Sequence, residues 1–238
     1  MANVNFPTAA GQKVSNLWNT SHALADEGSF YIANNATMGT TIAMTTSVVD
    51  DAATASSTHA QYSPFLYGYN KTAVTDPNGK SLYLQYLRLT QPIGGQAWTS
   101  ATQAFFSLRV DPTSRYASGG TALVVANANT NSSTTAAVDL YAGANVVGLP
   151  TAGARLLSHG MIQGTIPLPG DQWIFTFGDT TMPTNAVGAS AIKNLTIPCG
   201  PVVIAPGWSF QLDIWATALA AAPAFEVELG FVSRIAGL

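Results

Sequence analysis

Three carboxylates, Asp213, Glu226 and Glu228, lie in the alternating stretch "PGWSFQLDIWATALAAAPAFEVELGFVSRI" at residues 206–235. Paired carboxylates hydrolyse glycosidic bonds when they face each other across a cleft, roughly 5–9 Å apart, with one held in an apolar pocket. Glu226 and Glu228 instead share one face of a predicted strand, and Asp213 has the polar parity of its own strand. We therefore predict that all three face solvent, where charges also hinder pairing at sheet edges.

Other residue types that could carry chemistry are scattered. His22, His59 and His159 are far apart and lack metal-ligand spacing. We expect His159 to be hydrogen-bonded and partly buried. The nucleophile motif GxSxG is absent, although members of a Ser-His-Asp triad need not be neighbours in sequence. We predict a protein without cofactor, metal or enzymatic activity, with a β-sandwich hydrolase that uses Glu226 or Glu228 as the alternative.

The elements that hold these residues are strands. Period-two alternation over residues 209–215 and 224–231 predicts two strands, and the intervening Pro223 suits a connection between antiparallel neighbours. Pro206 and Gly207 fit the central positions of a type II turn before the first strand. Further strands are predicted at residues 29–34, 41–49, 81–90, 104–110, 121–128, 136–143, 172–178 and 194–205.

Asn-, Asp-, Pro- and Gly-rich turns separate these strands, and no long amphipathic helix interrupts them. The pattern predicts an all-β fold, an antiparallel two-sheet sandwich that eight core strands would make jelly-roll-like. Residues 28–238 form one domain in this interpretation, and residues 1–27 form an extended N-terminal arm. Within the arm, the spacing of Val14, Leu17 and Trp18 predicts a short helix.

The composition is poor in charge. Of the 238 residues, 47% are hydrophobic and 9% are charged, against a charged share of roughly 25% in an ordinary soluble domain. Few charges give weak repulsion between molecules, so we expect much of the surface to lie against partners in a permanent assembly.

Charge and hydrophobicity also limit which partners and which cellular compartment are expected. A net charge of −3 without a cluster of Lys or Arg argues against nucleic acid. The apolar stretches are short and broken by proline, so no membrane segment is expected. No signal peptide is evident, which predicts a protein that stays in the cytoplasm unless the cell lyses. The single cysteine, Cys199, allows no internal disulfide and is expected to be a buried thiol.

Aromatic residues divide into core and contact candidates. Trp173 and Trp208 share the parity of core residues. Tyr67 and Tyr69, in a segment that reads as a loop, and Trp215, on the polar parity of its strand, are candidates for an exposed contact with subunits or a ligand. Subunit contact is the preferred interpretation, and stacking on sugar rings is the alternative.

Five blocks of sequence carry a family resemblance: "YLQYLRL", "DPTSRYASGGTALV", "GDQWIFTFG", "GPVVIAPGWSFQLDIW" and "APAFEVELGF". In this order they resemble virion structural proteins of tailed bacteriophages, of the capsid decoration or cement type. The resemblance covers residues 28–235 loosely and is best in the last forty. The C-terminal "GFVSRIAGL" departs from the family pattern, which leaves the C-terminal contact open.

The resemblance implies a β-sandwich that stands on the exterior of a capsid, often as a trimer, and is assembled in the host cytoplasm. Its partners would be the major capsid protein and further copies of itself. We expect the arm to face the capsid, with Phe6, Val14, Leu17 and Trp18 as contact residues. A head-fibre or receptor-binding virion protein that binds host glycans is the alternative.

Overall fold

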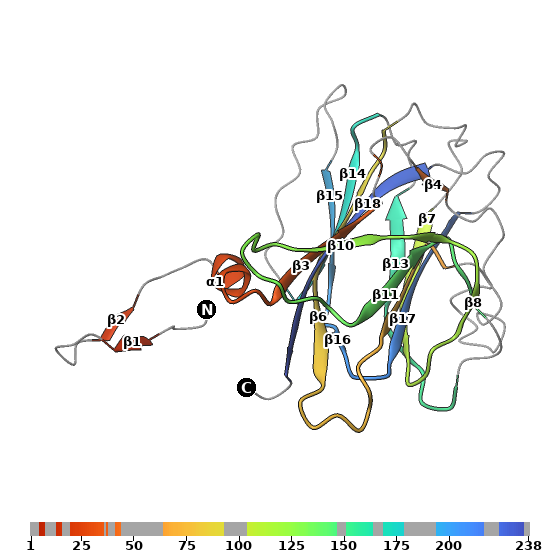
Figure 1. The fold of residues 1–238 in the computed structure, drawn as a ribbon. Helices are drawn as coiled ribbons and strands as arrows, with labels where there is room; N and C mark the ends of the chain where they lie inside the picture. Colours follow the sequence, from red (N-terminus) through yellow and green to blue (C-terminus); the bar gives the residue numbers. More distant parts are fainter. Residues whose placement is uncertain are drawn as a thin grey trace.

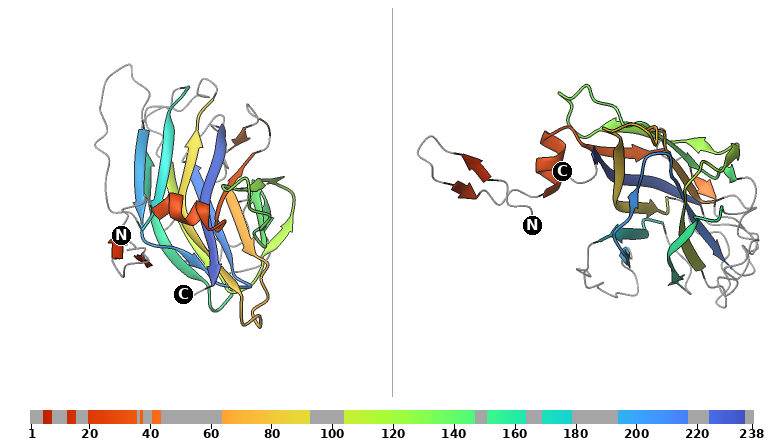
Figure 2. Two further views of the ribbon diagram at one scale, coloured as in Figure 1. Left: turned by 60° about the vertical axis from the view of Figure 1, so that its left-hand side comes forward. Right: turned by 90° about the horizontal axis from the view of Figure 1, so that it is seen from below.

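Two main β-sheets lie face to face in a computed structural model of the chain (Figure 1). The structure describes residues 5–7, 13–15, 20–35, 37, 41–43, 64–92, 104–146, 151–163, 169–178, 194–216 and 224–235. The axes of most long strands in the two sheets are roughly aligned (Figure 2), as in aligned sandwich packing. The predicted two-sheet sandwich is therefore confirmed.

The first sheet has eight strands, of which six follow one another in the order β10 (Val124–Asn127), β3 (Phe30–Asn34), β18 (Ala224–Ile235), β6 (Lys80–Thr90), β14 (Gln172–Phe177) and β15 (Asn194–Cys199). Two short strands complete it: β16 (Val203–Ile204) pairs with β6 and β4 (Ile42–Ala43) pairs with β18. The second sheet has six strands in the order β13 (Arg155–Gln163), β7 (Ala104–Asp111), β17 (Ser209–Ala216), β5 (Leu66–Asn70), β11 (Val138–Ala142) and β9 (Thr121–Ala122).

Two small sheets pair β1 (Asn5–Pro7) with β2 (Lys13–Ser15) and β8 (Tyr116–Ser118) with β12 (Asn145–Val146). The helix α1 (Thr20–Asp26) precedes β3. It begins later in the chain than the spacing of Val14, Leu17 and Trp18 predicted, because Val14 lies in β2 opposite Phe6. The division between arm and sandwich near residue 27 stays a prediction.

The strand order is that of a jelly roll. The eight core strands, in chain order, are β3, β5, β6, β7, β13, β14, β17 and β18. Numbered one to eight, they are arranged 1-8-3-6 in the first sheet and 2-7-4-5 in the second, the arrangement of two Greek keys. Consecutive strands therefore often lie in opposite sheets. For this reason β17 and β18 do not pair with each other, contrary to the expectation that they run out as neighbours.

The remaining strands close the sides of the sandwich. The stretch predicted as one strand at residues 121–128 is divided: β9 pairs with β11 in the second sheet, and β10 pairs with β3 in the first. Leu123, between them, is buried and its N–H donates to the carbonyl of Leu140. On the opposite side β15 runs parallel to β14. Among the described strands this is the one parallel pair. A parallel pair needs a long connection, and β14 and β15 are separated by residues 178–193 in the chain.

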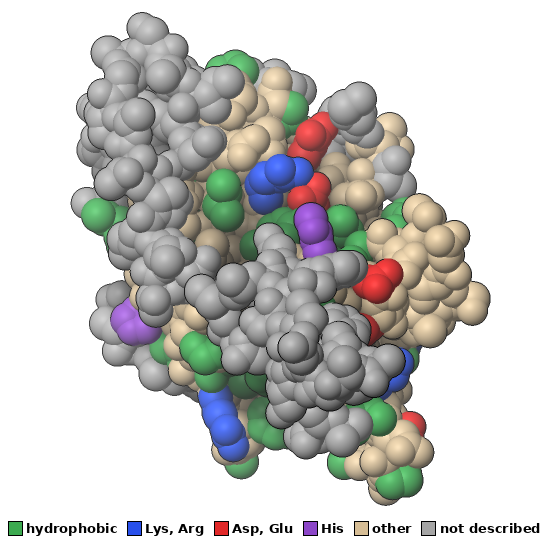
Figure 3. Space-filling view, turned by 90° about the vertical axis from the view of Figure 1, so that its left-hand side faces the viewer, with side chains coloured by type: hydrophobic (Ala, Val, Ile, Leu, Met, Phe, Trp, Pro, Cys, Tyr) green, Lys and Arg blue, Asp and Glu red, His purple; other side chains and the backbone are tan. Residues whose placement is uncertain are grey.

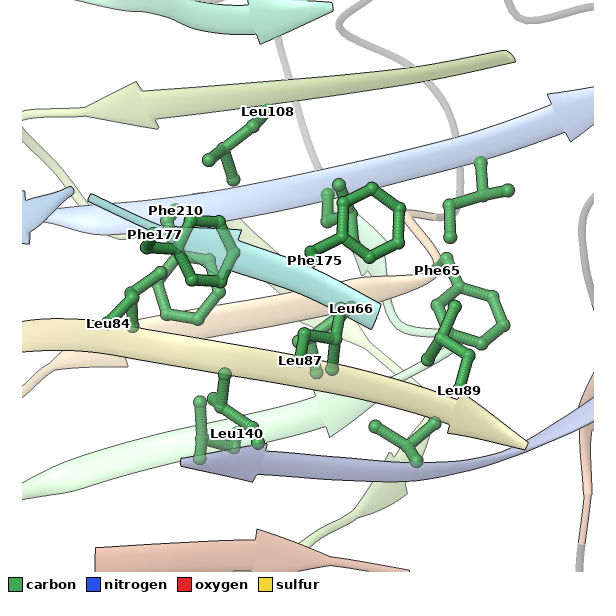
Figure 4. Packing of buried hydrophobic residues seen from close by; sticks show 14 of the residues in the cluster. Phe65, Leu66, Leu84, Leu87, Leu89, Leu108, Leu140, Phe175, Phe177 and Phe210 are labelled. Carbon is green, nitrogen blue, oxygen red and sulfur yellow. The ribbon is translucent and has the colours of Figure 1, made fainter. Parts of the chain in front are cut away.

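The core lies between the sheets and follows the alternation of the sequence. Trp173, Phe175 and Phe177 of β14 are buried as predicted. The ring of Phe175 lies edge-on to that of Phe106 from the second sheet, with 5.2 Å between their centroids. Phe175, Phe177 and Leu108 belong to one buried cluster (Figure 4). In β6 the buried leucines change parity, from Leu82 and Leu84 to Leu87 and Leu89. The reason is a β-bulge: Gly230 and Phe231 of β18 face Tyr86 and Leu84, which leaves Gln85 as the extra residue.

Two turn predictions are confirmed in part. Gly207 has a φ of 75°, and Trp208 N–H donates to the carbonyl of Ala205, as a type II turn with Pro206 requires. The turn at residues 76–79 also forms, with Gly79 N–H donating to the carbonyl of Asp76. It joins β5 to β6, which lie in different sheets, and so it is not a hairpin turn.

Two strands were missed. Residues 66–70 read as a loop, and residues 155–163 were assigned no structure, yet they form β5 and β13. In β5, Gly68 replaces the apolar residue that would have completed the alternation. In β13, two register shifts against β7 break the pattern. Both strands therefore lack a clean period of two.

Gly68 should tolerate no side chain. A Cβ at this position would lie 2.1 Å from Cε1 of Phe210 and 2.8 Å from Cδ2 of Leu140. We expect Gly68→Ala to lower the free energy of unfolding by about 1–3 kcal/mol through overpacking. Urea denaturation of the full chain measures this. Gly200→Ala is the matched control, because a Cβ there would meet nothing within 4 Å; equal stability of the two variants would contradict the described packing of β5 on β17 and β11.

Candidate functional site

Glu226 and Glu228 lie on the outer face of the eight-stranded sheet and are half-exposed, as their parity predicted. Glu228 forms an ion pair with Arg88 and accepts a hydrogen bond of 2.8 Å from the hydroxyl of Tyr86. These partners come from β6, which pairs with β18 along its length. The two glutamates line a groove of about 280 Å³ with Asn34, Asn35, Arg88, Thr90 and Val227.

Tyr86 holds Glu228 in place. Its ring covers Gly230, where a Cβ would lie 2.2 Å from Cε1 of the tyrosine. Burial, and next the hydrogen bond to the Glu228 carboxylate, raise the pKa of Tyr86 to about 12. The phenol therefore stays protonated and donates to Glu228 throughout the physiological range.

The prediction that Asp213 faces solvent is wrong. Its side chain is on the outer face of the six-stranded sheet, but that face is covered and Asp213 is 1% exposed. Its Oδ2 accepts hydrogen bonds from Nε2 of Gln211 at 3.1 Å and from Oγ of Ser107 at 3.3 Å. Its Oδ1 has no hydrogen-bond partner. Parity fixes which face a residue takes but not whether that face is covered.

A buried polar network surrounds Asp213. Arg109, Arg115 and Gln211 are all buried, and Nη1 of Arg115 donates to Oε1 of Gln211 at 3.4 Å. Burial raises the pKa of Asp213 to about 6, although the hydrogen bond from Gln211 and the positive charge of Arg109 oppose it. Removal from water thus outweighs the favourable contacts of this carboxylate.

At Asp111, unlike at Asp213, hydrogen bonds together affect the pKa more than burial does. Burial alone would raise its pKa, but hydrogen bonds from the backbone and hydroxyl groups of Thr151 and Thr113 together lower the pKa below its ordinary value. The distances are 2.9–3.0 Å. Asp111 therefore fixes two loop segments to the end of β7, which is a structural role.

The network does not have the geometry of a hydrolase triad. Sheet register places His159 of β13, Ser107 of β7 and Asp213 of β17 side by side. In a triad the imidazole lies between the nucleophile and the carboxylate, whereas here the serine is in the middle and donates to Asp213. His159 is exposed rather than partly buried as predicted.

The aromatic contact residues differ from expectation. Tyr67 lies in β5 and is 1% exposed, so the prediction of an exposed contact residue is wrong. Its hydroxyl accepts from the backbone N–H of Arg115 and is 3.0 Å from Oγ of Ser114. Tyr69 is partly buried and packs against a small cluster that Tyr67 forms with Ala144 and Val146. Trp215 lies in β17 opposite Phe105, but its side chain is outside the described residues.

The side chains of the predicted capsid-contact residues lie outside the part of the chain that the structure describes. Phe6 and Val14 pair across β1 and β2, and nothing is described of their side chains. Leu17 and Trp18 lie outside the described residues. Their contact role stays a prediction.

An exposed apolar strip that the sequence did not indicate lies on β13 and β16. Leu156, Leu157, Met161 and Val203 are 38%, 41%, 58% and 49% exposed. Leu157 and Val203 line a groove of about 270 Å³, together with other mainly apolar residues, among them Trp208 and Pro201. The guanidinium of Arg155 lies over the Trp208 ring, 5.5 Å from its centroid. We refer to Leu156, Leu157, Met161 and Val203 as the β13 strip.

In the described part of the chain, no three His, Cys, Asp or Glu side chains are grouped as a metal site would require. No helix among the described residues has the length and apolarity needed to cross a bilayer. Cys199 is buried as predicted, and burial raises the pKa of its thiol. Comparisons with protein-family models, with curated proteins and with solved structures found no match.

Asp213 should titrate far above an ordinary aspartate. Its pKa rises from 3.8 to about 6 in the folded protein, so the folded state binds a proton that the unfolded state has already lost. Stability therefore falls as pH rises across this interval, by up to about 3 kcal/mol. Carbon-13 NMR titration of the Asp213 carboxyl should give a midpoint near 6.

The variant Asp213→Asn provides the control, because it removes the titration and should remove this part of the pH dependence of unfolding. A midpoint near the ordinary value, or identical pH profiles for the variant and the wild type, would contradict the buried position of Asp213.

Proposed function

We propose that this chain is a virion structural protein that binds and stabilises a bacteriophage capsid shell from outside, as a decoration or cement protein. The observation that carries the proposal is an exterior with little charge and four exposed apolar side chains, three of them on the edge strand β13 and one on β16. The resemblance of five sequence blocks to such proteins supports the same function. The jelly roll agrees with it but does not by itself indicate a function, because one fold serves many.

The exterior is suited to lasting contact. Figure 3 shows few charged side chains among the residues coloured by type, singly or in small groups between neutral and hydrophobic ones. The β13 strip adds four exposed apolar side chains. A strand at the edge of a sheet presents unpaired backbone groups, and β13 pairs with β7 alone among the described strands. Such a surface favours a partner over free solution.

The partner for the β13 strip is a second copy of the same chain. The charged group of the groove beside it is Arg155, whose guanidinium already stacks on Trp208. The strip itself is uncharged, so two copies can meet through it without bringing like charges together. A trimer is the favoured assembly, because decoration proteins of this type often stand as trimers on the shell. In a trimer the strip of each copy would contact a different surface of its neighbour, since only a twofold axis brings the same surface of two copies together.

Many weak contacts can add up on a shell. Each copy would grip the major capsid protein through its arm and its neighbours through the sandwich, and multivalency raises the total affinity without one strong contact.

Replacing the contact side chains of the arm should prevent incorporation into particles. The substitutions are Phe6→Ser, Val14→Ser, Leu17→Ser and Trp18→Ser in the full chain. We prefer them to a deletion of residues 1–27, because Asn129 donates to the carbonyl of Asp26 and Ser29 to that of Leu24. Sedimentation of the variant with undecorated heads of the encoding phage should leave it in the supernatant, while its unfolding curve stays unchanged.

Val74→Ser, at an exposed turn residue, is the control and should still sediment with the heads. Sedimentation of the fourfold variant at the wild-type level would remove the arm from the contact. Failure of the wild-type chain to sediment would contradict the function itself.

The β13 strip should hold copies together. We expect Leu157→Ser combined with Met161→Ser to shift the purified protein from oligomer toward monomer, measured by light scattering coupled to size exclusion. Val124→Ser is the matched control, because Val124 is 51% exposed on β10, an edge strand of the other sheet. A wild-type chain that is monomeric at micromolar concentration, or an unaffected double variant, would contradict this contact.

A further inference from the structure

The groove on the outer face of the eight-stranded sheet is built by three adjacent strands, β3, β18 and β6 (Figure 1). Sheet register places Asn34, Glu228 and Arg88 in one row across these strands. It places Glu226 beside Thr90 in the next row. The volume of about 280 Å³ is just below the roughly 300 Å³ at which sites for drug-sized ligands begin. The groove therefore has room for about one ring.

The walls of the groove are fixed before any ligand arrives. Glu228 is held by Arg88 and by the hydroxyl of Tyr86. Asn35 is 8% exposed, and its Oδ1 accepts the backbone N–H of Val227 at 2.9 Å. This bond continues the pairing of β18 beyond the end of β3. Side chains that are already ordered lose little entropy on binding.

The lining mixes hydrogen-bond donors with acceptors. The guanidinium of Arg88 only donates, carboxylates only accept, and the Thr90 hydroxyl and the Asn34 amide do both. A purely apolar ligand would leave these groups without partners. An anion would face Glu226 and Glu228, and a cation would face Arg88 with one of the two carboxylates already neutralised by it. A ligand that suits this lining is neutral and carries groups that both donate and accept.

Hydroxyl groups on a ring meet this description, because each can donate one hydrogen bond and accept others. We propose that the groove formed by Asn34, Arg88, Thr90, Glu226 and Glu228 binds a neutral sugar. This site differs from the contact around Tyr67 and Trp215 that the sequence suggested for glycans. It is independent of the capsid function, since a protein of any role could carry it.

The test is an NMR titration of the nitrogen-15-labelled full chain with neutral monosaccharides: glucose, galactose, mannose and N-acetylglucosamine. At least one should shift the amide resonances of Asn34, Arg88 and Thr90 saturably at millimolar concentration. The anionic N-acetylneuraminic acid and the cationic glucosamine should bind at least tenfold more weakly than the best neutral sugar.

Two variants locate the site. Thr90→Val removes a hydroxyl and keeps the shape, and it should weaken binding about tenfold, as expected for one lost hydrogen bond to a ligand. Glu226→Gln keeps an acceptor oxygen but removes the charge that strengthens a hydrogen bond from a sugar hydroxyl, so it should also weaken binding. Thr121→Val on the exposed strand β9 and Glu27→Gln after α1 are the matched controls and should bind as the wild type does.

Three results would overturn the proposal: no saturable shift with any neutral sugar, tighter binding of a charged sugar, or equal affinity of the groove variants and their controls. Incorporation into particles is measured separately, so loss of sugar binding with normal incorporation would reject this site and leave the capsid function standing.

Discussion

The antiparallel pairing of β6 with β18 is the constraint on which the rest of the structure depends. These strands have 11 and 12 residues, and they pair from Lys80 with Ile235 to Thr90 with Glu226. Their inner faces supply leucines and phenylalanines to the core, and their outer faces supply the charged groups of the groove. The bulge at Gln85 reverses the parity of β6 halfway along the pair. The leucines before and after the bulge therefore all face the core. The other strands of the eight-stranded sheet lie to either side of this central pair.

The two sheets use their outer faces differently. The eight-stranded sheet leaves Glu228 and Arg88 half-exposed, where water still screens their charges. The six-stranded sheet covers Asp213, Arg109 and Arg115, and burial of charges is costly unless they are paired and hydrogen-bonded. One oxygen of Asp213 and Nε of Arg109 have no hydrogen-bond partner among the described residues, so this network does not recover the whole cost of burying its charges. The apolar core between the sheets offsets that cost.

The sequence predicted those parts of the fold that alternation alone decides. Residues 172–177 and 209–214 face the core on the expected parity because each strand has one apolar and one polar face. The sequence could not show that the outer face of β17 and β5 is covered, because that depends on segments far away in the chain. Asp213 and Tyr67 were therefore predicted to face solvent. The partners of Glu228 were equally out of reach: Arg88 is 140 residues away in sequence, and only the jelly-roll order makes β6 its neighbour. The β13 strip was missed because bulges hide the strand.

Under the proposed function, this weakly charged jelly roll with exposed apolar side chains on an edge strand is one of many identical copies on a larger shell. Low charge, the β13 strip and the arm then serve one purpose, which is to gain affinity from repeated contacts instead of from a single strong site. A density map of the intact phage particle at side-chain resolution tests this most directly. The account predicts a two-sheet jelly roll repeated on the outer surface of the capsid, with β13 facing a neighbouring copy and residues 1–27 on the major capsid protein. A particle whose outer shell lacks this fold, or carries it only at the tail, would contradict it.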